Sequence, residues 1–81
     1  MQTITNPAIS TVDARGSYCP GPLMELIRAI REGQVGDLIT VLSSDAGSKL
    51  DIPKWVEKAG HRLVGVEARD RYDEIVVEKM R

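Results

Sequence analysis

One cysteine, Cys19, stands in the run Tyr18-Cys19-Pro20-Gly21-Pro22, and it is the only thiol in the 81 residues. A helical pattern begins just after it, so the thiol is predicted to lie at a helix N-terminus, where backbone N–H groups lack partners and the helix dipole is positive. Such a position lowers the pKa of a cysteine from about 8.5 and favours the thiolate. The sequence therefore points to nucleophilic sulfur chemistry at Cys19, with a helix cap that has no chemistry as the alternative.

The helix that must present this thiol is predicted to start at Pro20 and to stop at Gly33. Proline suits a first turn because it lacks an N–H and fixes φ near the helical value, and Pro20 and Pro22 both fit there. The stiff turn through Pro20, Gly21 and Pro22 would leave the sulfur little freedom to lose when a partner docks. Apolar side chains then recur at helical spacing at Leu23, Leu26, Ile27 and Ile30.

Two residues upstream of the thiol are predicted to shape its loop. Asp13 is expected to accept backbone N–H bonds, as aspartates in turns do, and proton transfer by this carboxyl is the alternative. Gly16 is expected to adopt a backbone conformation that is barred to other residues.

The chain resembles the TusA-like, or SirA-like, sulfur carrier family, whose D-x-x-G-x-x-C-P-x-P signature matches the segment Asp13-Ala14-Arg15-Gly16-Ser17-Tyr18-Cys19-Pro20-Gly21-Pro22. The likeness runs from about Val12 to Met80. One departure is Ser17, where the family commonly has leucine. The resemblance implies that Cys19 accepts sulfane sulfur as a covalent persulfide, without any other cofactor, and that Asp13, Gly16, Pro20, Gly21 and Pro22 support the motif.

Partners also follow from the resemblance. It implies a donor protein, either a cysteine desulfurase or a rhodanese-type transferase, and an acceptor protein, of which a DsrE-like protein is one type. The sulfur would serve tRNA thiolation, cofactor biosynthesis or sulfur oxidation, and the sequence does not choose among them. A carrier that docks successive partners is expected to be a monomer.

Composition narrows the classes of function. With 11 basic and 12 acidic residues, the net charge of −1 provides no basic field for direct binding of nucleic acid or anionic lipid. No apolar stretch predicts a signal peptide or a membrane span, so a cytoplasmic protein is expected. No motif for stand-alone catalysis or for a metal site is found. A sulfur-relay carrier is therefore favoured over an independent enzyme.

The order of patterns predicts an α+β two-layer sandwich. Residues 1–8 are expected to be a flexible tail, and residues 9–81 a single domain. A strand is predicted from Ile9 to Asp13, a second from Leu38 to Leu42, and a helix ending near Ala59 that continues, bent, through Pro53. Two β-rich runs, at 61–68 and 72–79, complete a β-α-β-α-β-β order, with both helices on one face of a mixed four-stranded sheet. Val64, Val66 and Ala68 are expected to share one face.

Other residues leave alternatives open. Met24 is either a contact at a partner surface or a core filler, Trp55 is expected mostly in the core, and His61 is expected to be an exposed helix-end residue.

Two rival functions also remain. A thiol redox or regulatory protein would normally need a resolving cysteine, and a non-catalytic docking module would not need Cys19 at all. Four basic residues would steer an acidic partner if they gathered around Cys19, and would otherwise form an ordinary surface: Arg15, Lys49, Lys54 and Lys58.

Overall fold

The computed structural model describes residues 9–18 and 20–81, so the predicted tail at 1–8 and Cys19 itself lie outside the described residues. The elements follow in the order β1 (Ile9–Asp13), α1 (Gly21–Glu32), β2 (Leu38–Ser43), α2 (Ala46–Ala59), β3 (Arg62–Arg69) and β4 (Tyr72–Glu78). This order confirms the predicted β-α-β-α-β-β arrangement.

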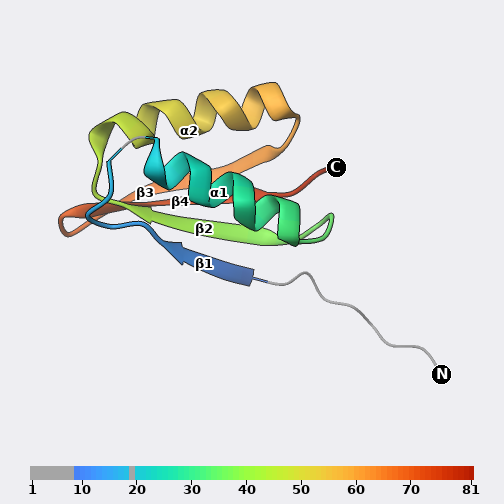
Figure 1. Cartoon of the computed structure of the whole chain (residues 1–81), viewed down its shortest axis with the longest axis horizontal. Helices are drawn as coiled ribbons and strands as arrows, with labels where there is room; N and C mark the ends of the chain where they lie inside the picture. Colours follow the sequence, from blue (N-terminus) through green and yellow to red (C-terminus); the bar gives the residue numbers. More distant parts are fainter. Residues whose placement is uncertain (1–8, 19) are drawn as a thin grey trace.

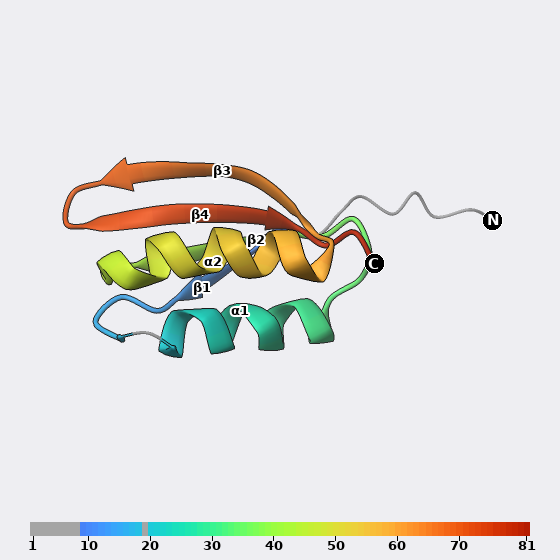
Figure 2. The same cartoon turned by 90° about the horizontal axis from the view of Figure 1, so that it is seen from above.

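The four strands form one mixed sheet in the order β1-β2-β4-β3. β1 runs parallel to β2, whereas β4 is antiparallel to both β2 and β3. Both helices lie on the same face of the sheet, as Figures 1 and 2 show from two directions. The parallel connection from β1 through α1 to β2 places the start of α1 beside the end of β1, which is where the motif residues are.

The core lies between the helices and the sheet and is built from aliphatic side chains. Alternate residues of β2 and β4 point into it, as expected when one face of a sheet is covered. The fully buried apolar side chains come from both helices and the two central strands: Pro22, Leu26, Ile39, Val41, Ile52, Val56, Ile75 and Val77. Trp55 is half-buried and packs against this cluster, which agrees with its predicted place in the core.

The helices begin and end close to where capping residues predict. Asp45 precedes α2 and accepts a hydrogen bond from the Ser48 N–H, at 3.0 Å. Gly60 ends α2 in the left-handed conformation, with φ 82°, and the helix is continuous through Pro53. α1 ends before Gly33, which is extended and not left-handed.

The prediction that Val64, Val66 and Ala68 share one inward face was wrong. The pairing of β3 with β4 shifts between Leu63 and Gly65, so that Val64 is an extra residue in a bulge. Val64 is 44% exposed, and only Val66 of the three packs against the core. The bulge accounts for Val64, which a strict period of two cannot anticipate. Ala68 pairs regularly with Asp73 and is exposed as well.

Lys79, directly after β4, closes the C-terminal end of α1. Its ammonium group donates to the carbonyl oxygens of Ile30, at 2.6 Å, and Gly33, at 2.8 Å. A helix C-terminus carries unpaired carbonyls and a partial negative charge, and both favour a cation there. Lys79 is 49 positions from Ile30 and 46 positions from Gly33 in the sequence, so the contact joins distant parts of the chain.

We predict that Lys79→Met lowers the free energy of unfolding by about 1 to 2 kcal/mol, because the two carbonyls lose a charged donor. Urea unfolding followed by Trp55 fluorescence would measure this loss. Lys79→Arg, which keeps a charged donor, should lose less than half as much. Equal stability of Lys79→Met and the wild type would show that the contact contributes nothing.

Candidate functional site

The loop between β1 and α1 is fixed to the end of β2 by two hydrogen bonds. The Ala14 N–H donates to the Leu42 carbonyl at 2.9 Å, which extends the pairing of the two strands by one step. The Gly16 N–H donates to the hydroxyl oxygen of Ser44 at 2.8 Å. Gly16 has φ +86°, a backbone conformation that residues other than glycine rarely adopt. Its backbone conformation is therefore the special one that the sequence predicts.

Asp13 and Arg15 form a compact pair at the start of this loop. The Asp13 carboxylate accepts the Arg15 backbone N–H at 3.2 Å and the guanidinium Nε and Nη2 at 2.9 and 2.8 Å. The guanidinium also lies over the ring of Tyr72, 5.0 Å from its centroid. These hydrogen bonds lower the pKa of Asp13 to about 2. The carboxyl therefore stays ionised at neutral pH, which suits holding a turn better than donating a proton.

The residues on either side of Cys19 in the chain are joined to each other. The Gly21 N–H donates to the Tyr18 carbonyl at 2.7 Å, and the Pro20 carbonyl accepts the Met24 N–H, the first turn of α1, at 2.8 Å. A Cβ added to Gly21 would lie 3.3 Å from that of Ser17, so a larger residue would crowd the loop. Pro22 is buried in the first turn. Pro20 occupies the cap position, just before the helix and not inside it.

Among the described residues, no side chain offsets the unpaired N–H groups and the partial positive charge at the N-terminus of α1. No side chain caps it by a hydrogen bond, and its first turn holds no acidic residue. Nothing in the described part of the chain therefore offsets the partial positive charge of this helix end.

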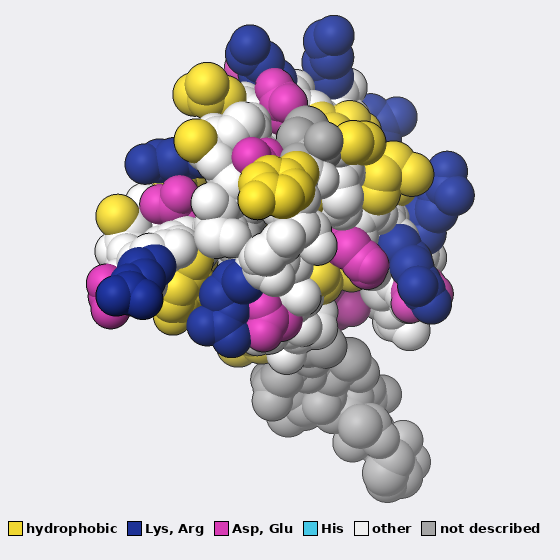
Figure 3. All heavy atoms as spheres, turned by 60° about the vertical axis from the view of Figure 1, so that its left-hand side comes forward, with side chains coloured by type: hydrophobic (Ala, Val, Ile, Leu, Met, Phe, Trp, Pro, Cys, Tyr) yellow, Lys and Arg dark blue, Asp and Glu magenta, His cyan; other side chains and the backbone are white. Residues whose placement is uncertain are grey.

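The surface around the motif combines exposed apolar side chains with charged ones (Figure 3). Tyr18 is 81% exposed and Met24 is 58% exposed, so Met24 does not fill the core and its alternative as a partner contact stays open. Figure 3 shows this end of the molecule, with hydrophobic side chains separated by charges of both signs. Two of the four basic residues are paired with carboxylates: Arg15 with Asp13 and Lys49 with Asp73.

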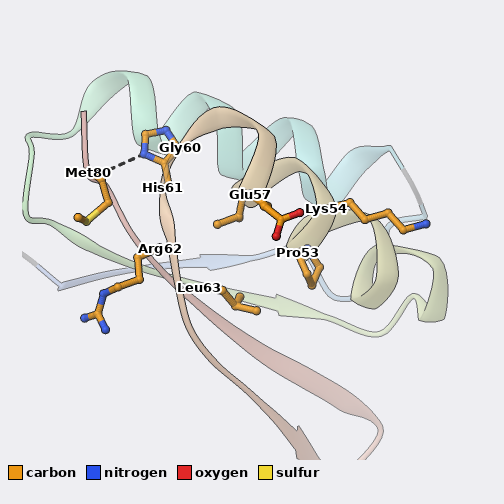
Figure 4. Close-up of a pocket in the computed structure, with 9 residues that line it drawn as sticks. Pro53, Lys54, Glu57, Gly60, His61, Arg62, Leu63 and Met80 are labelled. Carbon is orange, nitrogen blue, oxygen red and sulfur yellow. Dashed lines mark hydrogen bonds between the residues drawn. The ribbon is translucent and has the colours of Figure 1, made fainter.

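A separate hollow of about 620 Å³ lies between α2 and the start of β3 (Figure 4). None of the described motif residues lines it. His61 stands at its edge, where its Nδ1 accepts the Met80 N–H at 3.1 Å and its ring lies 5.7 Å from that of Trp55. His61 is half-buried, so its prediction as an exposed residue was wrong. The His61 ring is contacted by Met80 of the C-terminal segment and by Trp55 of α2, and the first of these contacts has no local sequence signal.

His61 should make stability depend on pH. Burial, and then the charges of Lys79 and Arg81, lower its pKa from the ordinary value of 6.5. The unfolded chain therefore takes up a proton at a higher pH than the folded chain does, and protonation favours unfolding. The contribution is fully present above about pH 6.5 and is lost as the pH falls further.

This effect is measurable by urea unfolding at pH 7.5 and pH 5.5. The wild type should lose more stability over that interval than His61→Gln, whose side chain does not titrate. Identical losses in the two proteins would show that the histidine is not linked to folding.

The structure brings the described motif residues, Asp13, Gly16, Pro20, Gly21 and Pro22, into one loop and helix start. Sequence reasoning missed two residues that contact this loop: Ser44, directly after β2, and Tyr72, the first residue of β4. Within the described ranges, no three metal-ligating side chains gather into a site. The described helices are also too short or too polar to cross a bilayer.

Comparison with known proteins gives a consistent result. The family model for sulfurtransferase TusA matches residues 10–79. A protein of Archaeoglobus fulgidus, named as a candidate sulfur carrier protein, is 57% identical over 70 residues, which are 86% of this chain and 96% of the relative. The sulfur carrier protein TusA of Pseudomonas entomophila is 39% identical over 56 residues, covering 69% of this chain and 70% of the relative. The crystal structure of a SirA-like protein from Desulfitobacterium hafniense superposes with a TM-score of 0.77 at 27% identity, covering 89% and 99% of the two chains.

Proposed function

The chain belongs to the TusA family of sulfur carrier proteins, and from that premise we propose that Cys19 is the residue on which it carries sulfur. The observation that supports this assignment best is the N-terminus of α1, which no described side chain caps and which begins two residues after the only cysteine in the sequence. The partial positive charge there stabilises a thiolate and, equally, the anionic persulfide that sulfur transfer would leave on it.

The proposed step is a thiol exchange. The Cys19 thiolate attacks the terminal sulfur of a persulfide on the donor protein, so that one S–S bond forms and one breaks. The donor leaves as a thiolate, and Cys19 carries the terminal sulfur as an anionic persulfide. Electrons balance without an external oxidant or reductant. In the second step an acceptor thiolate attacks the terminal sulfur, and Cys19 leaves as a thiolate.

The rigid start of α1 supports the same proposal. The hydrogen bond between Tyr18 and Gly21 holds the chain on both sides of the thiol, and the proline rings restrict the turn. A chain that is restrained on both sides of the reacting residue loses less entropy when it enters the active site of another protein. Exposed Tyr18 and Met24 provide apolar area for that contact.

A sulfur carrier requires a donor and an acceptor, and we propose their types from the chemistry. A cysteine desulfurase or a rhodanese-type transferase would present the sulfane sulfur, and a DsrE-like protein or a thiolating enzyme would receive it. We further propose that residues 9–81 act as one domain, as a monomer in the cytoplasm. The match of the family model to residues 10–79 supports the single domain.

Intact-mass spectrometry after incubation with a desulfurase and cysteine tests the assignment. A gain of about 32 Da that dithiothreitol removes is expected for one persulfide sulfur. Peptide mapping should place the added sulfur on the peptide that contains Cys19. Repeating the reaction with a rhodanese-type donor and thiosulfate would show which donor loads the protein faster. No gain in mass with either donor would overturn the proposal.

A further inference from the structure

We propose that Ser44 is a positioning residue for sulfur transfer, because its hydroxyl group fixes the loop that leads to Cys19. This inference rests on the proposed function of Cys19. Ser44 lies between β2 and α2, distant from the motif in sequence, and the family signature does not include it. Its hydroxyl oxygen accepts the N–H of Gly16 at 2.8 Å, three residues before the thiol in the chain.

The hydrogen bond from Gly16 to Ser44 is not needed to satisfy a buried group. Both residues are exposed, and water can serve the Gly16 N–H equally well in a free loop. Replacing water by a fixed hydroxyl changes little in stability, but it selects one position for the loop. Gly16 has φ +86°, and a glycine backbone can adopt many other conformations. A hydrogen bond that holds it in this one conformation therefore matters more than it would at another residue.

Ser44 itself is well placed to act as an anchor. On one side of it, Ser43 is fully buried, and its hydroxyl oxygen accepts the Asp45 N–H at 3.1 Å. On the other side, Asp45 accepts hydrogen bonds from the N–H and the hydroxyl of Ser48, at 3.0 and 2.9 Å. The backbone around Ser44 is thus tied to the first turn of α2 and to the core. The loop is held against a rigid junction and not against another loop.

Other contacts hold the two ends of the loop, and the hydroxyl of Ser44 contacts its middle. The pair of Asp13 and Arg15 holds the start of the loop, and Arg15 rests on the ring of Tyr72. The hydrogen bond between Tyr18 and Gly21 holds its end. Gly16 lies between these two fixed points, in a turn that the Ser17 N–H closes by donating to the Ala14 carbonyl at 3.1 Å. The hydroxyl of Ser44 ties this turn to the residue that follows β2. Misplacement of a nucleophile lowers the rate of a step without weakening the docking of the partner.

The test compares Ser44→Ala, Ser44→Thr and the control Ser10→Ala, which removes an exposed hydroxyl from β1. Loading of Cys19 by a desulfurase and cysteine is followed by intact mass at increasing carrier concentrations. We expect the maximal loading rate of Ser44→Ala to fall about three- to tenfold, in line with the loss of one hydrogen bond, while the half-saturating concentration changes less than twofold. Ser44→Thr, which keeps the hydroxyl, should load within twofold of the wild type.

Two further readouts separate positioning from other causes. Amide hydrogen exchange at Gly16 should be at least threefold faster in Ser44→Ala, and urea unfolding should match that of Ser10→Ala. A wild-type maximal rate in Ser44→Ala, or a threonine variant as slow as the alanine variant, would overturn the positioning role.

Failure of the carrier function itself would look different, because the wild type would then gain no sulfur. In that case the rate of Cys19 alkylation by iodoacetamide tests positioning separately, and an unchanged rate in Ser44→Ala would overturn it.

Discussion

Replacing Cys19 by serine is expected to abolish sulfur delivery while leaving the protein folded. A serine hydroxyl does not ionise at neutral pH and does not form a persulfide, so both transfer steps lose their nucleophile and their leaving group. With a labelled donor and an acceptor protein, delivery should fall to the level seen without any carrier. The free energy of unfolding should change by less than about 1 kcal/mol, because the substitution exchanges one atom.

The matched control is Ser17→Ala, which changes an exposed residue of the same loop without touching the thiol. It should deliver sulfur within a few-fold of the wild type. Full delivery by Cys19→Ser would favour the alternative of a docking module, in which the cysteine has no role. A stable sulfenic acid on Cys19 in place of a persulfide would instead favour the redox alternative, although the chain has no second cysteine to resolve it.

The second large effect is expected from Ile75→Ala. Ile75 lies in the central strand β4, is fully buried, and pairs in register with Val41 of β2 and Val66 of β3. Removing its outer carbons leaves a cavity between the sheet and the helices, which should cost about 2 to 5 kcal/mol. A small domain has only about 5 to 15 kcal/mol in total, so a large part of its stability would be lost.

Urea unfolding followed by Trp55 fluorescence would measure this loss. Ile9→Ala removes the same atoms from a side chain that is 73% exposed, and it should cost less than about 0.5 kcal/mol. Similar losses in the two variants would show that the packing between β4 and the helices is not what stabilises the fold.

The elements could be predicted from the sequence because their signals are local. Asp45 and Gly60 mark the two ends of α2, and the unbroken apolar run of β2 is typical of a central strand. The order of the elements then leaves few ways to build one sheet. Gly16 was also predictable, since glycine in a short loop often serves a backbone conformation that other residues avoid.

The contacts that were missed join distant parts of the chain. Ser44 looks like any polar residue after a strand, and nothing near it in sequence shows that its hydroxyl meets Gly16. Lys79 caps a helix that ends more than forty residues earlier. The burial of His61 depends on where the C-terminal segment returns, and the bulge at Val64 depends on the register with β4. Such features follow from the tertiary fold and have no local pattern. The role of Cys19 stays a prediction.

The most direct test of the carrier function is a chase with preloaded protein. The wild type would be loaded with ³⁵S from a desulfurase, separated from the donor, and mixed with an acceptor such as a DsrE-like protein. If Cys19 carries the sulfur, label should leave its persulfide and appear on the acceptor in equal amount, with no donor present, and Cys19 should return to a free thiol. Label that stays on the loaded protein, or that reaches the acceptor only when the donor is added back, would contradict a relay through Cys19.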